Sequence, residues 1–575
     1  MAESKRGYHD RRLENLKALR SPWEDPWSEI DKYLVPGYVR LNPETQHSDK
    51  GNRRRLDVLD NRGQRAHRIF RSGMQSGMTS KARPWCRLST HDMELRETPS
   101  VKHFLDLTTQ RMREVMNKTN IYDTFHMKYG ALGAVGTAVS YMSPDPRFIV
   151  RNNYVMAGHY WLATNHLGFV DTLYHVIPMN AQQIVGMFSR PDDNIPRIVR
   201  EAYDRGNKDQ MFMVHHAMEP RTHRDESRAS RKHMPFLSNY WMEVDDDKDR
   251  LLRESGSKIN RVIGSRWDVV GDDVYGYSLG MDALADVKQL QHEQARKMEI
   301  LDKTTRPPMS APTSMKGKRH SLLPGSITYN DDVNKNGGYR PAIDLTSYNL
   351  NSLLEDIRYL HECIDDTFYT PLFMAVSNMP GVQPRNEFEI AERKEERLLQ
   401  LGPALDRLQS EELQATIGIT YHYMKEAGIL PDLPEELEAE EGDLTVEYTS
   451  IMAQAQRAVG VNSIERLSSY IGNWAAAKPE ALDKFDVDQS IDEYADRIGT
   501  PTSIVVPDEE VQKVRQQRAE ELTREKQVAA AATLAPAAKD GAQAASLLAD
   551  TNANLGQGDP TRLLDELGLA GNGGV

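Results

Sequence analysis

Apolar residues recur at helical spacing along most of the chain, and one central stretch has the pattern of strands instead. In the first third, Trp27, Ile30 and Leu34 fall on one helical face, and Pro36–Gly37 ends that helix. Three further helices are predicted, at about 61–78, at about 100–118 and from Ile121 to Gly136, and a strand is predicted to begin at Thr137. Within the second helix, Gly73 and Gly77 leave a bare strip, whose most plausible role is close packing.

The stretch from 148 to 267 is typical of β-strands. A hairpin is predicted where strands at 160–163 and 169–177 flank the loop Thr164–Gly168. Further strands are predicted at about 211–215, 239–244 and 261–263, with the acidic run Asp245–Asp249 as a solvated loop between the last two. Helices before and after this stretch predict an α+β protein that is mainly helical.

A helix, a long loop and a second helix follow the strands. One apolar stripe runs from Leu284 to Leu301, and another runs from Leu353 to Phe368 and stops near Pro371. The Pro/Gly-rich segment between them, about 304–344, carries basic residues at Lys316, Lys318 and Arg319.

The last third begins with a very long helical pattern, from about 387 to 427. It is interrupted at Gly402 and Pro403, where a kink is expected because proline removes a backbone hydrogen bond and clashes with the preceding turn. Smaller helices are predicted at about 450–475 and 508–527. From about 528 the chain is Ala/Gly-rich and predicted to be disordered.

Composition excludes several classes of protein. The 575 residues include 72 basic and 85 acidic ones, a net charge of −13, so the chain is not a basic protein that binds nucleic acid over its whole surface. Two cysteines, Cys86 and Cys363, exclude a disulfide framework and a four-cysteine zinc site. The charged N-terminus and the lack of a long apolar run predict neither a signal peptide nor a membrane helix, and hence a soluble protein made in a cytoplasm.

Catalytic motifs are incomplete wherever they begin. Each of these partial motifs fails at a required position: Gly317-Lys318 is followed by Arg319, His292-Glu293 has Arg296 in place of a second histidine, His361-Glu362 has Asp365 there, and the acidic run has Arg250 where a calcium loop needs glycine. We therefore expect no enzyme, cofactor or bound metal. Because the carboxylates of metal-dependent nucleases scatter through a sequence, a DNA-processing enzyme such as a nuclease stays open as an alternative.

Several blocks, taken in order, resemble the portal protein of short-tailed phages, also called the head-to-tail connecting protein. The blocks are Trp23, Pro26, Trp27, Glu29, Ile30, Tyr33 and Pro36; Asp60; Gly73–Ser80 leading to Pro84-Trp85; Lys118–Tyr122; Gly133–Ala138; Leu401-Gly402-Pro403; Gly428–Pro431; Glu447–Ser450; Ala453–Arg457; Asp486 and Asp488; and Gly499–Pro501. Each block is weak alone, but their order and spacing are specific, and together they span about 20–525.

The resemblance implies a portal fold that assembles as a dodecameric ring. The implied regions are N-terminal helices and a β-rich wing (1–275), a first stem helix (276–303), a clip (304–344), a second stem helix (345–372), a channel loop (373–386), a long kinked wing helix with the following turn (387–444), crown helices (445–527) and a disordered tail (528–575). As a structural protein of the virion, the ring would stand at one capsid vertex, conduct DNA during packaging and ejection, and nucleate assembly of the procapsid.

The resemblance also implies the partners. Besides other copies of itself and double-stranded DNA in the channel, these are the large subunit of the terminase motor, tail adaptor or tail tube proteins, the major capsid protein, and scaffolding or internal core proteins. A membrane is not among them. A conduit must not hold phosphates, so basic residues near the DNA should be few, and Lys316, Lys318, Arg319 and Arg385 are the candidates. A different structural protein of the virion is the remaining alternative, which the β-rich stretch disfavours.

Overall fold

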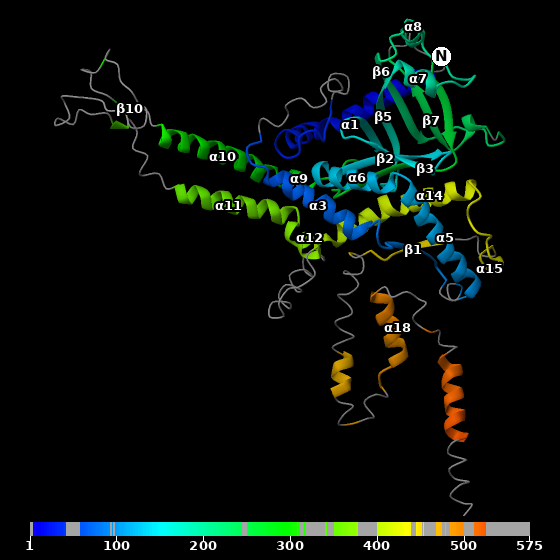
Figure 1. Cartoon of the computed structure of the whole chain (residues 1–575). Coiled ribbons are helices and arrows are strands. Elements are labelled where there is room, and N and C mark those ends of the chain that lie inside the picture. Colours follow the sequence, from blue (N-terminus) through cyan, green and yellow to red (C-terminus); the bar gives the residue numbers. More distant parts are fainter. Residues whose placement is uncertain are drawn as a thin grey trace, which may run out of the picture. The chain divides into compact units, whose positions relative to one another are not determined.

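The structure is a computed structural model that divides the chain into two compact units, Met1–Ser463 and Ile464–Val575. The residues that it describes are 4–41, 58–92, 95, 98–228, 230–243, 250–306, 309–310, 316, 340–341, 350–377, 400–438, 444–450, 452, 467–473, 478, 484–498, 506 and 511–524. Figure 1 shows the labelled helices and strands in chain order. Among the described residues, no helix is both long and apolar enough to cross a membrane.

The first unit opens with helix α1 (Lys5–Tyr33), which is longer than the sequence pattern predicted. Its second half is the predicted apolar face. Its first half buries Leu13 and Leu16 in a cluster with side chains of the five-stranded sheet. Pro22 and Pro26 lie inside the helix. Packing of the apolar face against the sheet therefore stabilises a helix that local propensity alone disfavours.

Three predicted helices are confirmed, as α3 (Arg62–Met78), α5 (Pro99–Lys118) and α6 (Ile121–Val135). Helix α6 is buried on almost every side. It ends at Gly136, whose φ of 75° is left-handed, and a Cβ there would lie 2.2 Å from the carbonyl oxygen of Gly276. A side chain is excluded at this turn by both the dihedral angle and the close approach.

The bare strip on α3 is a packing surface, as predicted, although side chains rather than a second backbone fill it. A Cβ on Gly73 would lie 2.2 Å from Cδ1 of Phe373, and one on Gly77 would lie 3.0 Å from Cγ of Met452. Phe373 belongs to helix α12 (Thr370–Ser377), a short helix that the sequence pattern did not predict.

Two antiparallel sheets follow α6. The first has the order β3-β2-β9, formed by β2 (Thr137–Asp145), β3 (Ile149–Val155) and β9 (Val262–Arg266). The second has the order β4-β5-β6-β7-β8, formed by β4 (Tyr160–Thr164), β5 (Val170–Asn180), β6 (Met211–Pro220), β7 (Phe236–Trp241) and β8 (Arg253–Ser257). The β4–β5 hairpin confirms the predicted one, whereas strands β3 and β8 were not predicted. The Asp245–Asp249 run lies outside the described residues.

Short helices cover part of the larger sheet. They are α7 (Ala181–Met187), α8 (Arg197–Asp204) and the 3₁₀ turn η1 (Arg231–His233). Ile184 of α7 and Val199 of α8 are buried in a second apolar cluster with side chains of β5, β6 and β7. This cluster is separate from the main core.

Both helices of the predicted helix–loop–helix are confirmed, whereas most of the loop lies outside the described residues. The described elements are α9 (Leu279–Asp282), α10 (Leu284–Thr305), the paired strands β10 (Met309–Ser310) and β11 (Arg340–Pro341), and α11 (Leu350–Thr367). Helix α12 follows at once.

The predicted long helix is described from residue 400. It is α-helical over 400–408, continues as a π-helix over Gln409–Leu413, and ends as α14 (Gln414–Glu426). Gly402 and Pro403 lie inside the first part, and because 378–399 lie outside the described residues, the kink there stays a prediction. The π-helix was not predicted.

Two elements end the first unit. Helix α15 (Glu435–Glu438) precedes strand β12 (Leu444–Tyr448), which pairs antiparallel with β1 (Cys86–Thr90). The sequence pattern predicted neither strand, because neither alternates cleanly and each is completed by a partner more than 350 residues away in the chain.

The second unit has helices at 467–473, α18 (Val487–Ile498) and 511–524. The guanidinium of Arg515 donates two hydrogen bonds, of 2.6 and 2.7 Å, to the carboxylate of Asp488 and so joins the last two helices. The Ala/Gly-rich tail lies outside the described residues.

Candidate functional site

Helices α10 and α11 lie side by side and lead to the β10–β11 pair (Figure 1). The pair is held by apolar side chains at helical spacing: Val287 and Leu290 on α10, and Ile357, Leu360 and Ile364 on α11, are all buried. Both stripes join the main core. The two helices are therefore rooted in the body of the first unit and are not a detached hairpin.

A polar cluster around Asp60 fixes the pair to the segment before α3. The Gln291 Oε1 accepts hydrogen bonds from the backbone N–H of Leu59 (2.6 Å) and of Asp60 (2.9 Å), and its Nε2 donates to the Asp60 carbonyl (2.9 Å). The Asp60 carboxylate accepts from Nε2 of Gln294 (2.7 Å) and lies 2.9 Å from Nε2 of His361. We call Asp60, Gln291, Gln294 and His361 the Asp60 anchor.

The anchor continues into helix α3. The backbone N–H of Arg62 donates to Oδ1 of Asp60 (2.8 Å), and the Arg62 guanidinium forms a two-point pair with the carboxylate of Asp365 on α11, with Nε at 3.0 Å from Oδ1. Two-point guanidinium–carboxylate pairs are strong and directional. Helix α3 and both long helices are thus joined at one place.

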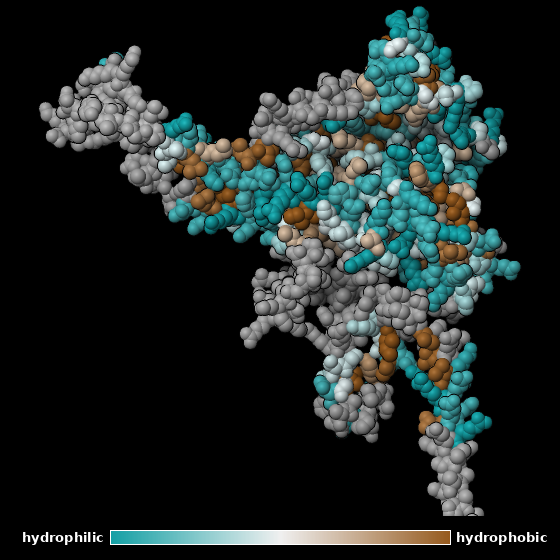
Figure 2. Space-filling view, viewed as in Figure 1, coloured by the Kyte–Doolittle hydropathy of each residue, from teal (hydrophilic) through white to brown (hydrophobic). Residues whose placement is uncertain are grey.

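Beyond the anchor the apolar stripe of α10 is uncovered. Met298 and Leu301 are 58% and 45% exposed, and Figure 2 shows apolar surface along this part of the helical pair. The apolar stripe of α10 thus runs from the buried core to the surface of the helical pair.

The face of α11 opposite its buried stripe is acidic. Glu355, Tyr359, Glu362 and Asp366 are exposed at helical spacing, and Tyr359 is 63% exposed. The whole helix has five acidic residues and one basic residue, whereas α10 has four of each. A polyanion would be repelled by this face of α11.

Of the four basic candidates, the structure describes one. Lys316 is exposed, and Lys318, Arg319 and Arg385 lie outside the described residues. The two ends of the loop are joined, because Ser310 of β10 pairs with Arg340 of β11. The role of the four residues stays a prediction.

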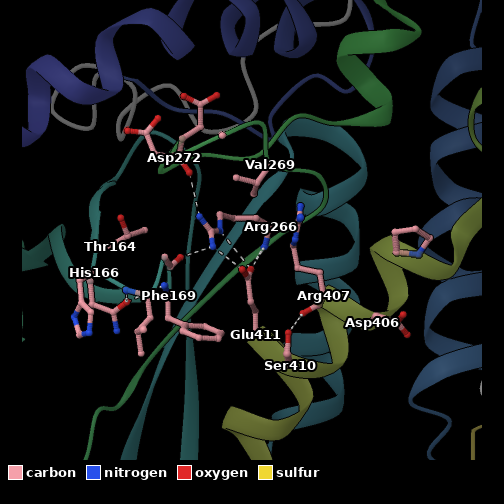
Figure 3. A pocket seen from close by; sticks show the side chains of 16 residues that line it. Thr164, His166, Phe169, Arg266, Val269, Asp272, Asp406, Arg407, Ser410 and Glu411 are labelled. Carbon is pink, nitrogen blue, oxygen red and sulfur yellow. Dashed lines mark hydrogen bonds and ion pairs between the residues drawn. The ribbon is translucent and has the colours of Figure 1, made fainter.

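A hollow of about 680 Å³ lies beside the π-helix (Figure 3). It is lined by the β4–β5 loop, by the segment 266–273 after β9, and by 403–411. At its base the guanidinium of Arg266 donates to Oε1 of Glu411 (2.6 Å) and to the carbonyl oxygens of Gly168 (2.6 Å) and Asp273 (3.1 Å). Because its donors are already used, Arg266 braces the three segments and is not free to bind an anion.

The next residue of the π-helix forms a second buried ion pair. The carboxylate of Glu412 pairs with the ammonium of Lys128 on α6 and accepts a hydrogen bond from Oγ of Ser265 (2.8 Å). Lys128 Nζ also donates to Oγ of Ser140 (3.0 Å). Burial lowers the pKa of Lys128, and Glu412 opposes that shift. Consecutive carboxylates of the π-helix thus both accept hydrogen bonds from residues of strand β9.

Buried histidines form a third polar cluster in the larger sheet. Nε2 of His175 lies 2.9 Å from Nδ1 of His216, whose Nε2 lies 2.9 Å from Oγ of Ser238. Burial lowers the pKa of His175 to about 3, so the ring is neutral. Over the described ranges, no group of three or more His, Cys, Asp or Glu side chains is arranged to hold a metal ion.

Sequence reasoning noticed Asp60 but missed the anchor and the buried ion pairs. One signal was available: Gln291 and Gln294 fall on the apolar face of a helix, and Glu411 and Glu412 follow Leu405 and Leu408 on theirs. Polar groups at buried positions require partners. The identity of those partners depends on the fold.

Comparison with known proteins gives a consistent result. Residues 6–505 match the profile of a family described as "Bacteriophage head to tail connecting protein". The chain is 40% identical over 551 residues to a probable portal protein of Bordetella phage BPP-1, which covers 95% of this chain and 94% of that protein. It is 37% identical over 547 residues to the portal protein of Salmonella phage epsilon15, which covers 95% and 96%.

Proposed function

Because the chain belongs to the bacteriophage head-to-tail connecting proteins, the portal family of the virion, we propose that twelve copies form a ring around an axial channel at one vertex of the capsid. Double-stranded DNA passes through this channel during packaging and ejection. The observation that carries the proposal is the family match over 6–505 together with similarity to two portal proteins over 95% of the chain. The family is structural and not enzymatic, so the alternative of a DNA-processing enzyme is set aside.

The regions of the chain take their roles from the same family. We assign 276–303, which holds α9 and all but the last two residues of α10, and 345–372, which holds α11, to the stem. We assign 304–344 to the clip, 373–386 to a channel loop, 1–275 and 387–444 to the wing, and 445–527 to the crown. The Asp60 anchor supports the stem assignment, since a stem that transmits force between motor and capsid needs a rigid attachment to the wing. The two-point Arg62–Asp365 pair provides one.

The channel surface is assigned to α11. Its exposed Glu355, Glu362 and Asp366 present carboxylates to passing DNA. Each basic residue in contact with phosphate would add affinity by releasing counterions, so an acidic lining keeps the duplex mobile. Lys316, Lys318, Arg319 and Arg385 are the proposed exceptions at the clip and channel loop.

The proposed partners follow from the position of the ring. The clip docks the large subunit of the terminase motor and then the tail adaptor or tail tube, while the wing contacts the major capsid protein and scaffolding or internal core proteins. In this role the ring also nucleates procapsid assembly.

Electron microscopy tests the proposal. The purified chain is imaged in negative stain and the particles are sorted into class averages. We expect rings of about twelvefold symmetry with a central hole. Filaments, or compact particles without a hole, would contradict the assignment.

A further inference from the structure

Strand β2 begins beside the hollow and ends at an exposed turn, the β2–β3 turn. At its start, Thr137 pairs with Arg266, which lies at the base of the hollow. At its end, Asp145 pairs with Ile149 across the β2–β3 turn. The nine residues of β2 separate the two features by about 26 Å, at roughly 3.3 Å per residue. Both features are therefore held rigidly, and neither can reach the other within one chain.

The β2–β3 turn is strained and presents two side chains to solvent. Ile149 has a φ of 71°, a left-handed conformation that a β-branched residue rarely adopts. The Asp145 Oδ1 accepts hydrogen bonds from the backbone N–H of Arg147 (2.8 Å) and Phe148 (3.3 Å) and so holds the turn. Phe148 is 48% exposed, and Arg147 is exposed beside it. We call Arg147 and Phe148 the tip.

The hollow has the complementary chemistry. Leu167 and Phe169, from the β4–β5 loop, are exposed apolar side chains in its lining, and Leu167 is 67% exposed. Asp272 and Asp406 lie on different sides of the Arg266–Glu411 pair (Figure 3).

After its ion pairs are taken into account, the lining of the hollow carries a net negative charge. Arg266 is committed to Glu411, and Arg407 lies 3.4 Å from the carboxylate of Asp268. The carboxylates of Asp272 and Asp406 have no ion-pair partner among the residues that the structure describes. The hollow thus fits a segment that combines an apolar side chain with a positive charge.

We propose that the tip of one copy of this chain seats in the hollow of the next copy. Phe148 packs on Leu167 and Phe169, and Arg147 meets the acidic side chains of the lining. Because the tip and the hollow are different surfaces at opposite ends of one strand, the contact repeats head to tail, as a closed ring requires. This inference rests on the proposed function, which supplies the neighbouring copy.

Chemical crosslinking between copies tests the contact. In a Cys363→Ser background, Phe148→Cys and Leu167→Cys are combined in one chain, and purified rings are treated with a short bismaleimide. Cys86 can stay, because it is buried and burial raises the pKa of its thiol to about 12. We expect a ladder of covalent oligomers on a denaturing gel. An equal mixture of the two single variants should stop at dimers, since each copy then offers half of the contact.

Matched controls decide between the outcomes. Ile198→Cys replaces Phe148→Cys in a control chain, because Ile198 is also exposed but lies on α8. Rings that crosslink no better than this control overturn the contact and leave the proposed ring intact. Efficient crosslinking of the Phe148→Cys single variant would also overturn it, because two tips would then meet. A Cys363→Ser parent that forms no rings contradicts the proposed function and the contact with it.

A charge exchange gives an independent readout. Arg147→Glu should lower the fraction of chains in rings several-fold, measured by light scattering after size-exclusion chromatography. Adding Asp406→Arg to that variant should restore ring formation. A loss that Asp406→Arg or Asp272→Arg does not reverse would contradict the charge pairing.

Discussion

At the scale of residues, Asp60 joins three segments that are far apart in the sequence. Its carboxylate faces Gln294 and His361, while its backbone is bound by Gln291. Only 13% of the Asp60 side chain is exposed, so water cannot reach most of its carboxylate. If a protein partner is removed, water therefore does not replace the lost hydrogen bond. The position therefore sets the relation of α10 and α11 to α3.

We predict that Asp60→Ala loosens the helical pair. Loss of the acceptor leaves the Gln294 amide and the His361 ring without their partner, at a cost of about 1–3 kcal/mol in the free energy of unfolding. Amide hydrogen exchange should become faster in α11, and the midpoint of thermal unfolding should fall.

The control for this variant is Asp302→Ala, at an exposed position on the same α10 helix. It should leave both measurements unchanged. Equal effects of the two variants would show that the anchor does not hold α11.

At the scale of elements, close backbone approach sets how α9 and α10 leave the core. A Cβ on Gly280 would lie 2.5 Å from the carbonyl oxygen of Ala134 in α6, and 3.1 Å from that of Gly133. Nearby, Oγ of Ser278 donates to the same Ala134 carbonyl (2.8 Å) and accepts from the backbone N–H of Met281 (3.0 Å). The start of the stem pair thus lies directly on the end of α6.

We predict opposite effects for two glycine substitutions in helices. Gly280→Ala should lower the free energy of unfolding by about 1–3 kcal/mol, because the added methyl group meets backbone that cannot move aside. Gly418→Ala in α14, where nothing lies within 4 Å of the added Cβ, should raise it by up to about 1 kcal/mol through helix propensity.

Urea titration of both variants under identical conditions measures the difference. If Gly280→Ala proved as stable as the parent chain, the distance between the backbones of α9 and α6 would have to be larger than in the structure.

At the scale of the whole molecule, buried neutral histidines connect stability to pH. Burial lowers the pKa of His67 and of His9 to about 4 and that of His175 to about 3, below the ordinary value of 6.5. At pH values between the lowered pKa of each histidine and 6.5, the unfolded chain therefore binds protons that the folded chain does not. The free energy of unfolding falls as the pH drops through this window. Buried Glu219, whose pKa is raised by burial, opposes the trend.

We predict that acidification from about pH 6.5 to about pH 4 destabilises the chain, with each of these histidines contributing up to about 1.4 kcal/mol per pH unit. His67→Gln should flatten the pH profile of the free energy of unfolding, measured by urea titration. His292→Gln, at an exposed position, should leave the profile parallel to that of the parent. Parallel profiles for both variants would mean that His67 is protonated equally in the folded and unfolded chain.

The sequence by itself determined the helices and strands whose patterns are local. Helices α3, α5, α6, α10 and α11 and the β4–β5 hairpin follow from periodicity and from glycine and proline positions, because a helix or a hairpin buries one face of its own residues. The ordered motifs from Trp23 to Pro501 also identified the family, which the comparisons show. The sequence alone was therefore sufficient to identify the family.

Only the tertiary structure decided which distant residues meet. Strand β12 exists because β1 offers it a ladder, and the first half of α1 exists because the sheet buries Leu13. Apart from Arg62, the partners described for Asp60, Glu411 and Glu412 lie between 145 and 301 residues away. A buried charge requires a partner, and this requirement can be read from the sequence. Which residue becomes that partner depends on the fold, because the spacing of residues along the chain does not determine which distant residues meet.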